Sequence, residues 1–97
     1  MFVGVVEFDL LLGDVRSLKQ KRSVVRPILA ALRKQFDVSV AEVADQEVHR
    51  RARIAVAVVA PDAARCIEVL DRCERSVDAR VEAELLSARR RLFGEED

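Results

Sequence analysis

A cluster of basic side chains stands where the sequence predicts the first turns of a helix. Its members are Arg16, Lys19, Lys21, Arg22 and Arg26, and Arg33 follows further along the same segment. With about 100° between successive residues, one flank of this helix carries Lys19, Arg22, Arg26 and Arg33. Clustered cations of this kind are typical of surfaces that contact phosphate groups.

The position of this cluster argues against a purely structural role. The positive end of the helix macrodipole disfavours cations in the first turns by roughly 0.3–1 kcal/mol each, and stability alone would favour acids there. Backbone N–H groups and cations at one helix end together form a site for phosphate. Two alternatives stay open: the cluster is a solubilising face, or it is neutralised by Asp14, Glu7 or Glu84.

Groups that could carry out catalysis are scarce. The chain has no Asn, Thr, Trp or Tyr, and His49 is its only histidine. Acylphosphatase chemistry, for example, needs an arginine in the first loop, which Arg16 could supply, and an asparagine that orients water, which this chain lacks. Catalysis usually needs a group that titrates near neutral pH beside a positioned partner. We therefore expect a protein that is not an enzyme, with no catalytic residue, metal or cofactor, and we assign no role to His49.

The two cysteines fit the same interpretation. Cys66 and Cys73 are seven residues apart in a predicted helix, which places them about 10 Å apart on one face, too far for a disulfide. We expect both to be small buried residues. The N-terminus has no signal-peptide pattern, and no apolar run approaches the roughly 20 residues that span a bilayer. These features predict a cytoplasmic protein with no membrane partner.

The elements that must position the basic cluster follow from hydrophobic periodicity. Alternation predicts strands over residues 2–12, 38–43, 52–60 and 79–85, the first with its even-numbered side chains buried. Apolar stripes predict one kinked helix from Ser17 to Phe36, with Gln20 completing a capping box, and a second helix from Pro61 to about Val77. Residues 89–97 read as a charged tail that frays.

The order of elements is βαββαβ, which predicts a single ferredoxin-like α+β domain over residues 1–97. Its four-stranded antiparallel sheet would carry both helices on one face. The other face would hold small apolar residues with charges at its ends, suited to a second sheet stacking on it or to solvent. One kind of RNA readout stacks bases on aromatic side chains of the two central strands. Because all four Phe are expected outside these positions or on the core-facing register, we expect no such readout here.

Three segments together resemble the YlxP-like family of small bacterial proteins. They are the runs Ser17-Leu18-Lys19-Gln20-Lys21-Arg22, Val38-Ser39-Val40-Ala41-Glu42-Val43 and Ala55-Val56-Ala57-Val58-Val59. The resemblance implies a ferredoxin-like fold and no established activity. Genes of this family often stand beside genes for translation initiation and ribosome maturation, which implies a role near RNA or the ribosome.

The sequence leads to two hypotheses. The first is a non-enzymatic module that binds structured RNA or a ribosomal particle through the basic helix end, although the balance of 17 basic and 17 acidic residues excludes a strong general nucleic-acid binder. The alternative is a protein-interaction module that homodimerises through the open face of its sheet and has no nucleic-acid partner.

Overall fold

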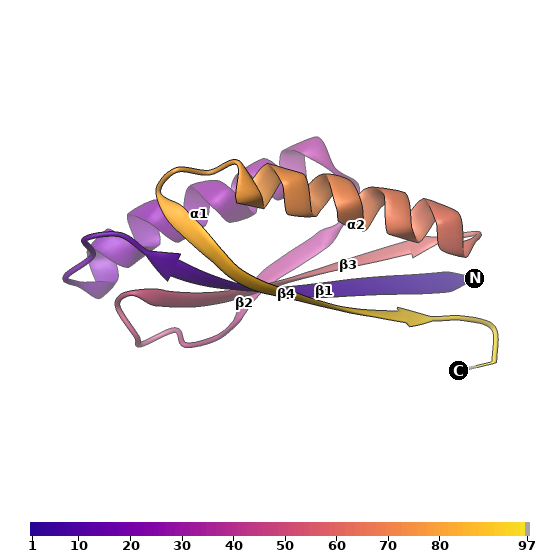
Figure 1. Ribbon diagram of the computed structural model, residues 1–97, viewed down its shortest axis with the longest axis horizontal. Helices are drawn as coiled ribbons and strands as arrows, with labels where there is room; N and C mark the ends of the chain where they lie inside the picture. Colours follow the sequence, from indigo (N-terminus) through magenta and orange to yellow (C-terminus); the bar gives the residue numbers. More distant parts are fainter. Residues whose placement is uncertain (97) are drawn as a thin grey trace.

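The computed structural model describes residues 1–96 and contains six elements in the predicted order. They are β1 (Phe2–Leu12), α1 (Leu18–Gln35), β2 (Ser39–Ala44), β3 (Arg51–Ala60), α2 (Ala63–Asp78) and β4 (Ala83–Phe93). The strands form one antiparallel sheet in the order β2-β3-β1-β4, and both helices lie on the same side of it (Figure 1). The ferredoxin-like α+β fold is confirmed.

The core lies between the helices and one face of the sheet. In β1, the side chains of Val6, Phe8, Leu10 and Leu12 are at most 1% exposed, as the alternating pattern predicts. Their neighbours Ala52, Ile54 and Val56 in β3 are equally buried. The intervening residues of both strands point away from the helices and form what we call the open face, which no other element of residues 1–96 covers.

Helix α1 begins where the capping pattern predicts. The Ser17 hydroxyl accepts a hydrogen bond from the Gln20 backbone N–H at 3.1 Å. The Gln20 side chain accepts from the backbone N–H of Arg16 at 2.6 Å, one residue before the position that a standard capping box uses. The helix continues through Pro27 to Gln35, so the prediction of one helix rather than two is confirmed.

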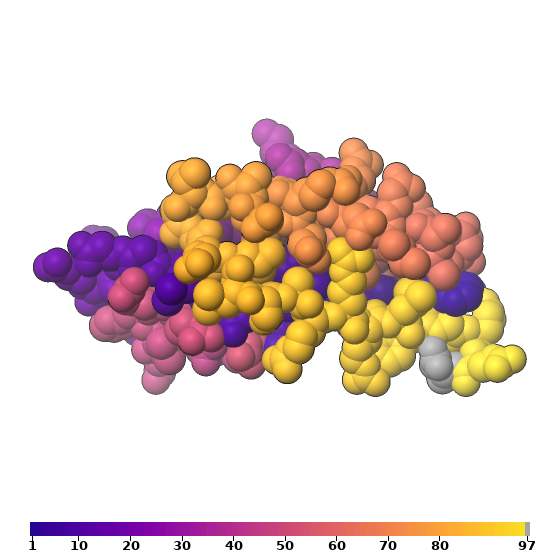
Figure 2. All heavy atoms as spheres, viewed as in Figure 1, coloured from indigo at the N-terminus to yellow at the C-terminus, as the bar shows by residue number. Residues whose placement is uncertain are grey.

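The C-terminal strand differs from its prediction. Val81 belongs to the strand predicted over residues 79–85, but it is fully exposed in the α2–β4 connection, and β4 begins at Ala83. The prediction of a frayed tail is wrong for residues 89–93, which continue β4 and pair with β1 as far as Val3 opposite Phe93. Backbone hydrogen bonds to β1 hold this polar segment as a strand. Figure 2 shows β4, coloured orange to yellow, crossing the front of the molecule below α2. Asp97 lies outside the described residues.

Side chains of the arginine run at the end of β4 alternate between the two faces of the sheet. Arg90 points toward the helices, where its guanidinium lies 2.8 Å from Asp71 and 3.1 Å from Glu74 of α2. Arg89 and Arg91 stand opposite Glu7 and Val5 on the open face. This alternation gives three consecutive like charges separate partners and surroundings.

The helix-face position predicted for the cysteines is confirmed, since Cys66 and Cys73 of α2 are both fully buried. Burial raises the pKa of the Cys73 thiol from its ordinary value of 9.0 to about 11. Neither α1 nor α2, the helices of the described chain, is both long and apolar enough to cross a lipid bilayer.

Raising the pH above 9 is expected to destabilise the protein through Cys73. Below the pKa of the unfolded thiol, both states keep the proton; above it, the unfolded chain ionises while the folded thiol stays neutral until about pH 11. The free energy of unfolding should therefore fall by about 1 kcal/mol between about pH 8 and about pH 10. Urea unfolding at both pH values measures this fall. A Cys73→Ala variant that shows the same fall contradicts the assignment.

Candidate nucleic-acid interface

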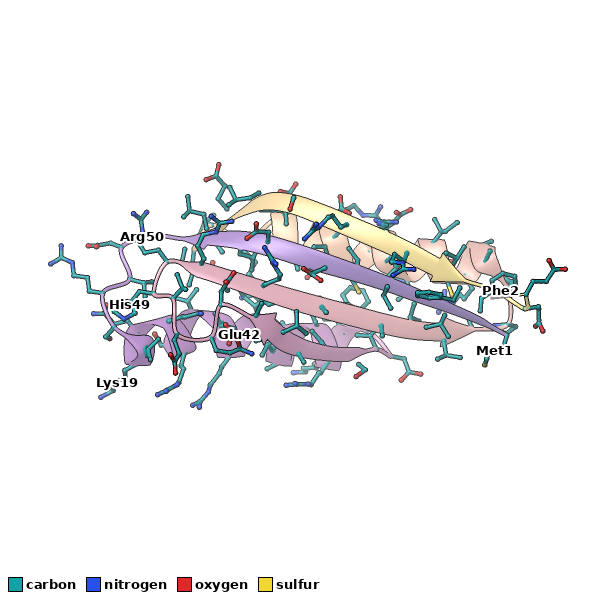
Figure 3. All side chains as sticks on the ribbon, turned by 90° about the horizontal axis from the view of Figure 1, so that it is seen from below. Met1, Phe2, Lys19, Glu42, His49 and Arg50 are labelled. Atoms are coloured by element: carbon teal, nitrogen blue, oxygen red, sulfur yellow. The ribbon has the colours of Figure 1, made fainter. Side chains whose placement is uncertain are left out.

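The basic cluster predicted from the sequence lies at one end of the long axis of the molecule. Helix α1 begins there, and the β2–β3 loop reaches the same end, so that Lys19, His49 and Arg50 all lie at this end of the molecule (Figure 3). The Arg50 Nε–H donates to the carbonyl oxygen of Gly13 at 2.9 Å, which ties the β1–α1 connection to the β2–β3 loop. We call this region the basic end.

Three members of the cluster remain candidates for direct contact with a ligand. Lys19, Arg22 and Arg26 are exposed, and within residues 1–96 no carboxylate forms an ion pair with any of them. Helix α1 has no acidic residue in its first turn. The positive end of its macrodipole and the three cations therefore act in the same direction on an anion in solvent.

Lys21 is placed differently from the prediction. Its side chain is 3% exposed, with Nζ 2.9 Å from Glu42 Oε2 of β2, and it also donates a hydrogen bond to the carbonyl oxygen of Asp45. The expectation that Lys21 contacts phosphate is wrong, because this ammonium group is used inside the protein. Lys21 precedes the buried Val25 by four residues, and Ile28 follows Val25 by three. This is the spacing of one helix face, so it could have indicated that Lys21 is buried.

Arg16 and Arg33 also have partners within the chain. Arg16 Nε lies 3.1 Å from Asp14 Oδ1, with both side chains 80% exposed, so solvent screens this pair and it contributes little to stability. Arg16 remains accessible to a ligand. Arg33 donates to the carbonyl oxygen of Val40 in the edge strand β2 at 2.9 Å, which makes it a structural contact rather than part of a binding surface.

A groove of about 310 Å³ runs between α1 and the end of β2. Arg22 and Arg26 lie on its helix side, and Gln46 and Glu47 on its loop side. The Lys21–Glu42 ion pair joins the two sides of the groove. Lys21 also holds the loop through its hydrogen bond to the carbonyl of Asp45, the one described residue with a positive φ. This ion pair therefore positions the walls of the groove.

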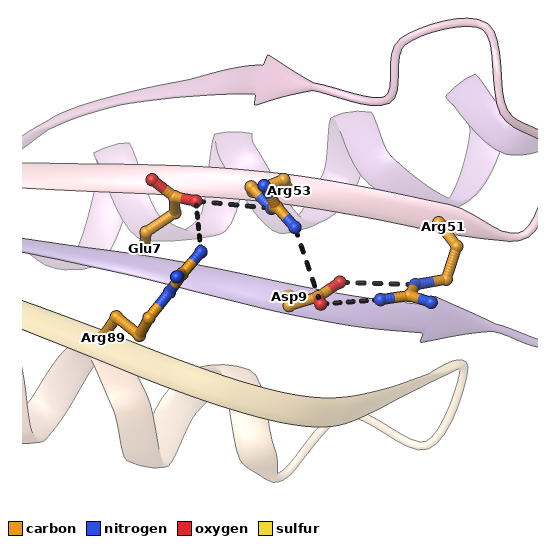
Figure 4. Close-up of polar contacts among 5 residues, drawn as sticks. All are labelled: Glu7, Asp9, Arg51, Arg53 and Arg89. Carbon is orange, nitrogen blue, oxygen red and sulfur yellow. Dashed lines mark hydrogen bonds and ion pairs between the residues drawn. The ribbon is translucent and has the colours of Figure 1, made fainter.

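A second charged cluster crosses the middle of the open face (Figure 4). The sequence predicts charges only at the ends of this face. Arg51 lies 2.6 Å from Asp9, and Arg53 lies between Asp9 and Glu7 at 3.8 Å and 3.3 Å. Arg89 approaches Glu7 at 3.5 Å. The Arg53 Nε is buried and has no hydrogen-bond partner in the described structure. The carboxylates of β1 thus hold arginines of both neighbouring strands against the sheet.

The open face also carries an aromatic ring that sequence reasoning missed. Because Phe93 pairs with Val3, its side chain points to the open face from the edge strand β4, outside the two central strands β1 and β3. The Arg91 guanidinium lies 4.9 Å from the centroid of this ring. The sequence pattern assigns Phe93 to a frayed tail, and a frayed segment has no defined side on which its side chains lie.

The described residues contain no candidate metal site. Among residues 1–96, no group of three or more His, Cys, Asp or Glu side chains is arranged to hold a metal ion. His49 is exposed in the β2–β3 loop, apart from the buried Cys66 and Cys73 of α2.

Comparisons with known proteins agree with this architecture. The chain is 29% identical over 91 residues to the uncharacterized protein YlxP of Bacillus subtilis strain 168, covering 94% of this chain and 99% of that one. A de novo designed protein with a ferredoxin fold, solved by NMR, superposes with a TM-score of 0.57 at 12% identity over 98% of this chain and 88% of its own. The model of a family described as proteins of unknown function, DUF503, matches residues 3–90. Since that match spans most of the chain, the protein belongs to the DUF503 family.

Proposed function

We propose that the protein is a non-enzymatic module that binds structured RNA, such as that of a ribosomal particle, through its basic end. The observation that carries this proposal is that Lys19, Arg22 and Arg26 are exposed and have no carboxylate partner in residues 1–96. Lys19 stands in the first turn of α1, where the helix dipole favours anions, and Arg22 and Arg26 continue the same flank of the helix. Lys21 supports the surface from inside by joining α1 to β2 and its loop.

Contacts of this kind position a protein on nucleic acid without reading its sequence. Each phosphate contact releases condensed counterions, so the logarithm of the binding constant falls with the logarithm of salt concentration by about 0.7–0.9 per contact. Three contacting cations therefore predict a slope of about −2 to −3. A surface held by apolar contacts would show almost no salt dependence.

Reversing two charges at the basic end tests the proposal. The double variant Arg22→Glu/Arg26→Glu is expected to weaken co-sedimentation with ribosomal subunits at least tenfold, because two phosphate contacts become repulsive. Its salt slope should become less negative by about 1.5. Both residues are exposed and unpaired in the described structure, so circular dichroism should show an unchanged fold.

A matched control separates a specific surface from net charge. The variant Lys34→Glu/Arg75→Glu carries the same charge change on exposed residues away from the basic end, at the C-terminal turns of α1 and α2. This control should co-sediment like the parent protein. Equal losses in the two double variants, or no loss in either, would contradict binding through the basic end.

A further inference from the structure

The open face of the sheet is hollowed beside β4. This hollow has a volume of about 620 Å³, within the range of small-ligand sites, and is lined by Val5, Glu7, Ala55, Arg89 and Arg91. Val5 of β1 and Ala55 of β3 form the apolar part of its lining, and the Glu7 carboxylate lies beside Arg89, with which it forms an ion pair. The hollow thus combines small apolar side chains with the Arg89–Glu7 pair and the Arg91 guanidinium.

An arginine–phenylalanine contact stands next to this hollow. Arg91 lies over the Phe93 ring at 4.9 Å, and both side chains are on the open face beside Val5 and Val3. Nucleic-acid bases stack on aromatic rings and on arginine guanidinium planes, and such stacking tolerates any sequence because every base has a π-face. The edge of the hollow therefore offers the kind of surface on which an unpaired base can stack.

The charges of the open face favour an anionic strand. Four arginines, Arg51, Arg53, Arg89 and Arg91, share this face with three carboxylates, Glu7, Asp9 and Glu84, which leaves an excess of one positive charge. Within each strand the two arginines are two residues apart, a spacing of about 6.8 Å along the strand. Successive phosphates of an extended nucleic-acid strand are separated by a similar distance.

A second copy of the chain fits this face less well. Two open faces brought together would each contribute the same excess of positive charge, and like charges across an interface cost several kcal/mol. An acidic peptide would satisfy the charges but would leave the Arg91–Phe93 contact unused as a stacking surface. Charge complementarity and stacking together favour RNA.

We propose that the open face binds a single-stranded RNA segment, with one unpaired base stacked at the Arg91–Phe93 pair and phosphates along the arginines of β3 and β4. This inference rests on the proposed function in naming RNA as the partner, and it adds a second contact surface of different chemistry. The basic end would hold the phosphates of structured RNA, while the open face would hold an unpaired stretch leading away from it.

Fluorescence anisotropy with a labelled oligoadenylate of about eight nucleotides, within the usual length of a single-strand site, tests the proposal. Arg91→Gln and Phe93→Leu are each expected to weaken binding about tenfold, since each removes a stacking surface. Arg91→Lys keeps the charge but not the guanidinium plane, and should lose part of the affinity. Arg72→Gln is the matched control, because Arg72 also lies over a phenylalanine, Phe36, but on the helix side; it should bind like the parent. Thermal unfolding checks that every variant folds.

The outcomes distinguish this inference from the proposed function. Parent-like oligoadenylate binding by folded Arg91→Gln and Phe93→Leu overturns the open-face site. So does a polyglutamate probe that binds in place of the oligoadenylate, or a dimer that Phe93→Leu dissociates. If Arg22→Glu/Arg26→Glu abolishes ribosomal co-sedimentation while the β4 variants change nothing, only the inference fails. If the β4 variants lose oligoadenylate while Arg22→Glu/Arg26→Glu co-sediments normally, the inference holds and the basic-end function fails.

Discussion

Replacing Lys21 with methionine is expected to lower the free energy of unfolding by about 3 kcal/mol, because removing one partner of a buried ion pair leaves the other uncompensated. The abandoned partner is Glu42, whose Oε2 is buried and has only the Lys21 ammonium beside it in the described structure. The carbonyl of Asp45 loses its hydrogen bond in the same variant. For a domain of this size, the midpoint of thermal unfolding should fall by about 12–24 °C.

Urea unfolding with a double-mutant cycle measures this effect. Lys19→Met is the control, because Lys19 is exposed two residues away and its replacement should change stability by less than about 0.5 kcal/mol. Lys21→Met/Glu42→Leu removes both charges and should recover much of the loss, since an apolar pair of similar volume is often as stable as a buried ion pair. A loss below about 1 kcal/mol for Lys21→Met would show that the pair is solvated in solution.

Replacing Gly4 with valine is expected to cost about 2–3 kcal/mol. Gly4 lies on the helix side of β1, and a Cβ added there would stand 3.1 Å from Leu70 Cδ1 and 3.2 Å from Cys66 Cβ of α2. Valine adds two further methyl groups to this contact, and overpacking a core forces side chains off their rotamers or moves the helix. Close approach of α2 to the sheet therefore depends on the missing side chain.

A second substitution on α2 identifies the cause. Leu70→Ala opens space at the same contact, so it should cost less in the Gly4→Val background than in the parent, with a coupling above about 1 kcal/mol. Gly13→Val is the control, because no atom lies within 4 Å of a Cβ built at Gly13. Purely additive losses at Gly4 and Leu70, measured by urea unfolding, would exclude the steric explanation.

Local patterns predicted most of the fold because they depend on neighbouring residues. The alternation in residues 2–12 and 52–60 matches the more and less buried sides of β1 and β3, except that Phe2 at the start of β1 is only partly buried. Ser17 marks the start of α1, since its hydroxyl can reach only the first backbone N–H groups that follow it. The order of the elements then leaves few ways to cover one sheet with two helices.

Predicting the candidate site from the sequence succeeded only in part. Exposure of Lys19, Arg22 and Arg26 on one flank of α1 follows from helical spacing. A lysine at the edge of the apolar stripe of α1 faces solvent or is buried depending on which residue lies against it. For Lys21 that residue is Glu42 of β2, which is distant in sequence. The missing information was the position of β2 and its loop beside α1.

Within this chain the amino-acid order alone determined where helices and strands form and which of their sides are apolar, since these are properties of short segments. Only the tertiary structure decided that residues 89–93 are a strand, because pairing with β1 supplies hydrogen bonds that the local sequence does not announce. The same pairing turned Phe93 and Arg91 to the open face. Contacts between segments far apart in sequence determine whether a charged side chain such as Lys21 is buried. They also determine, through the strand register, on which side of the sheet a ring such as Phe93 lies.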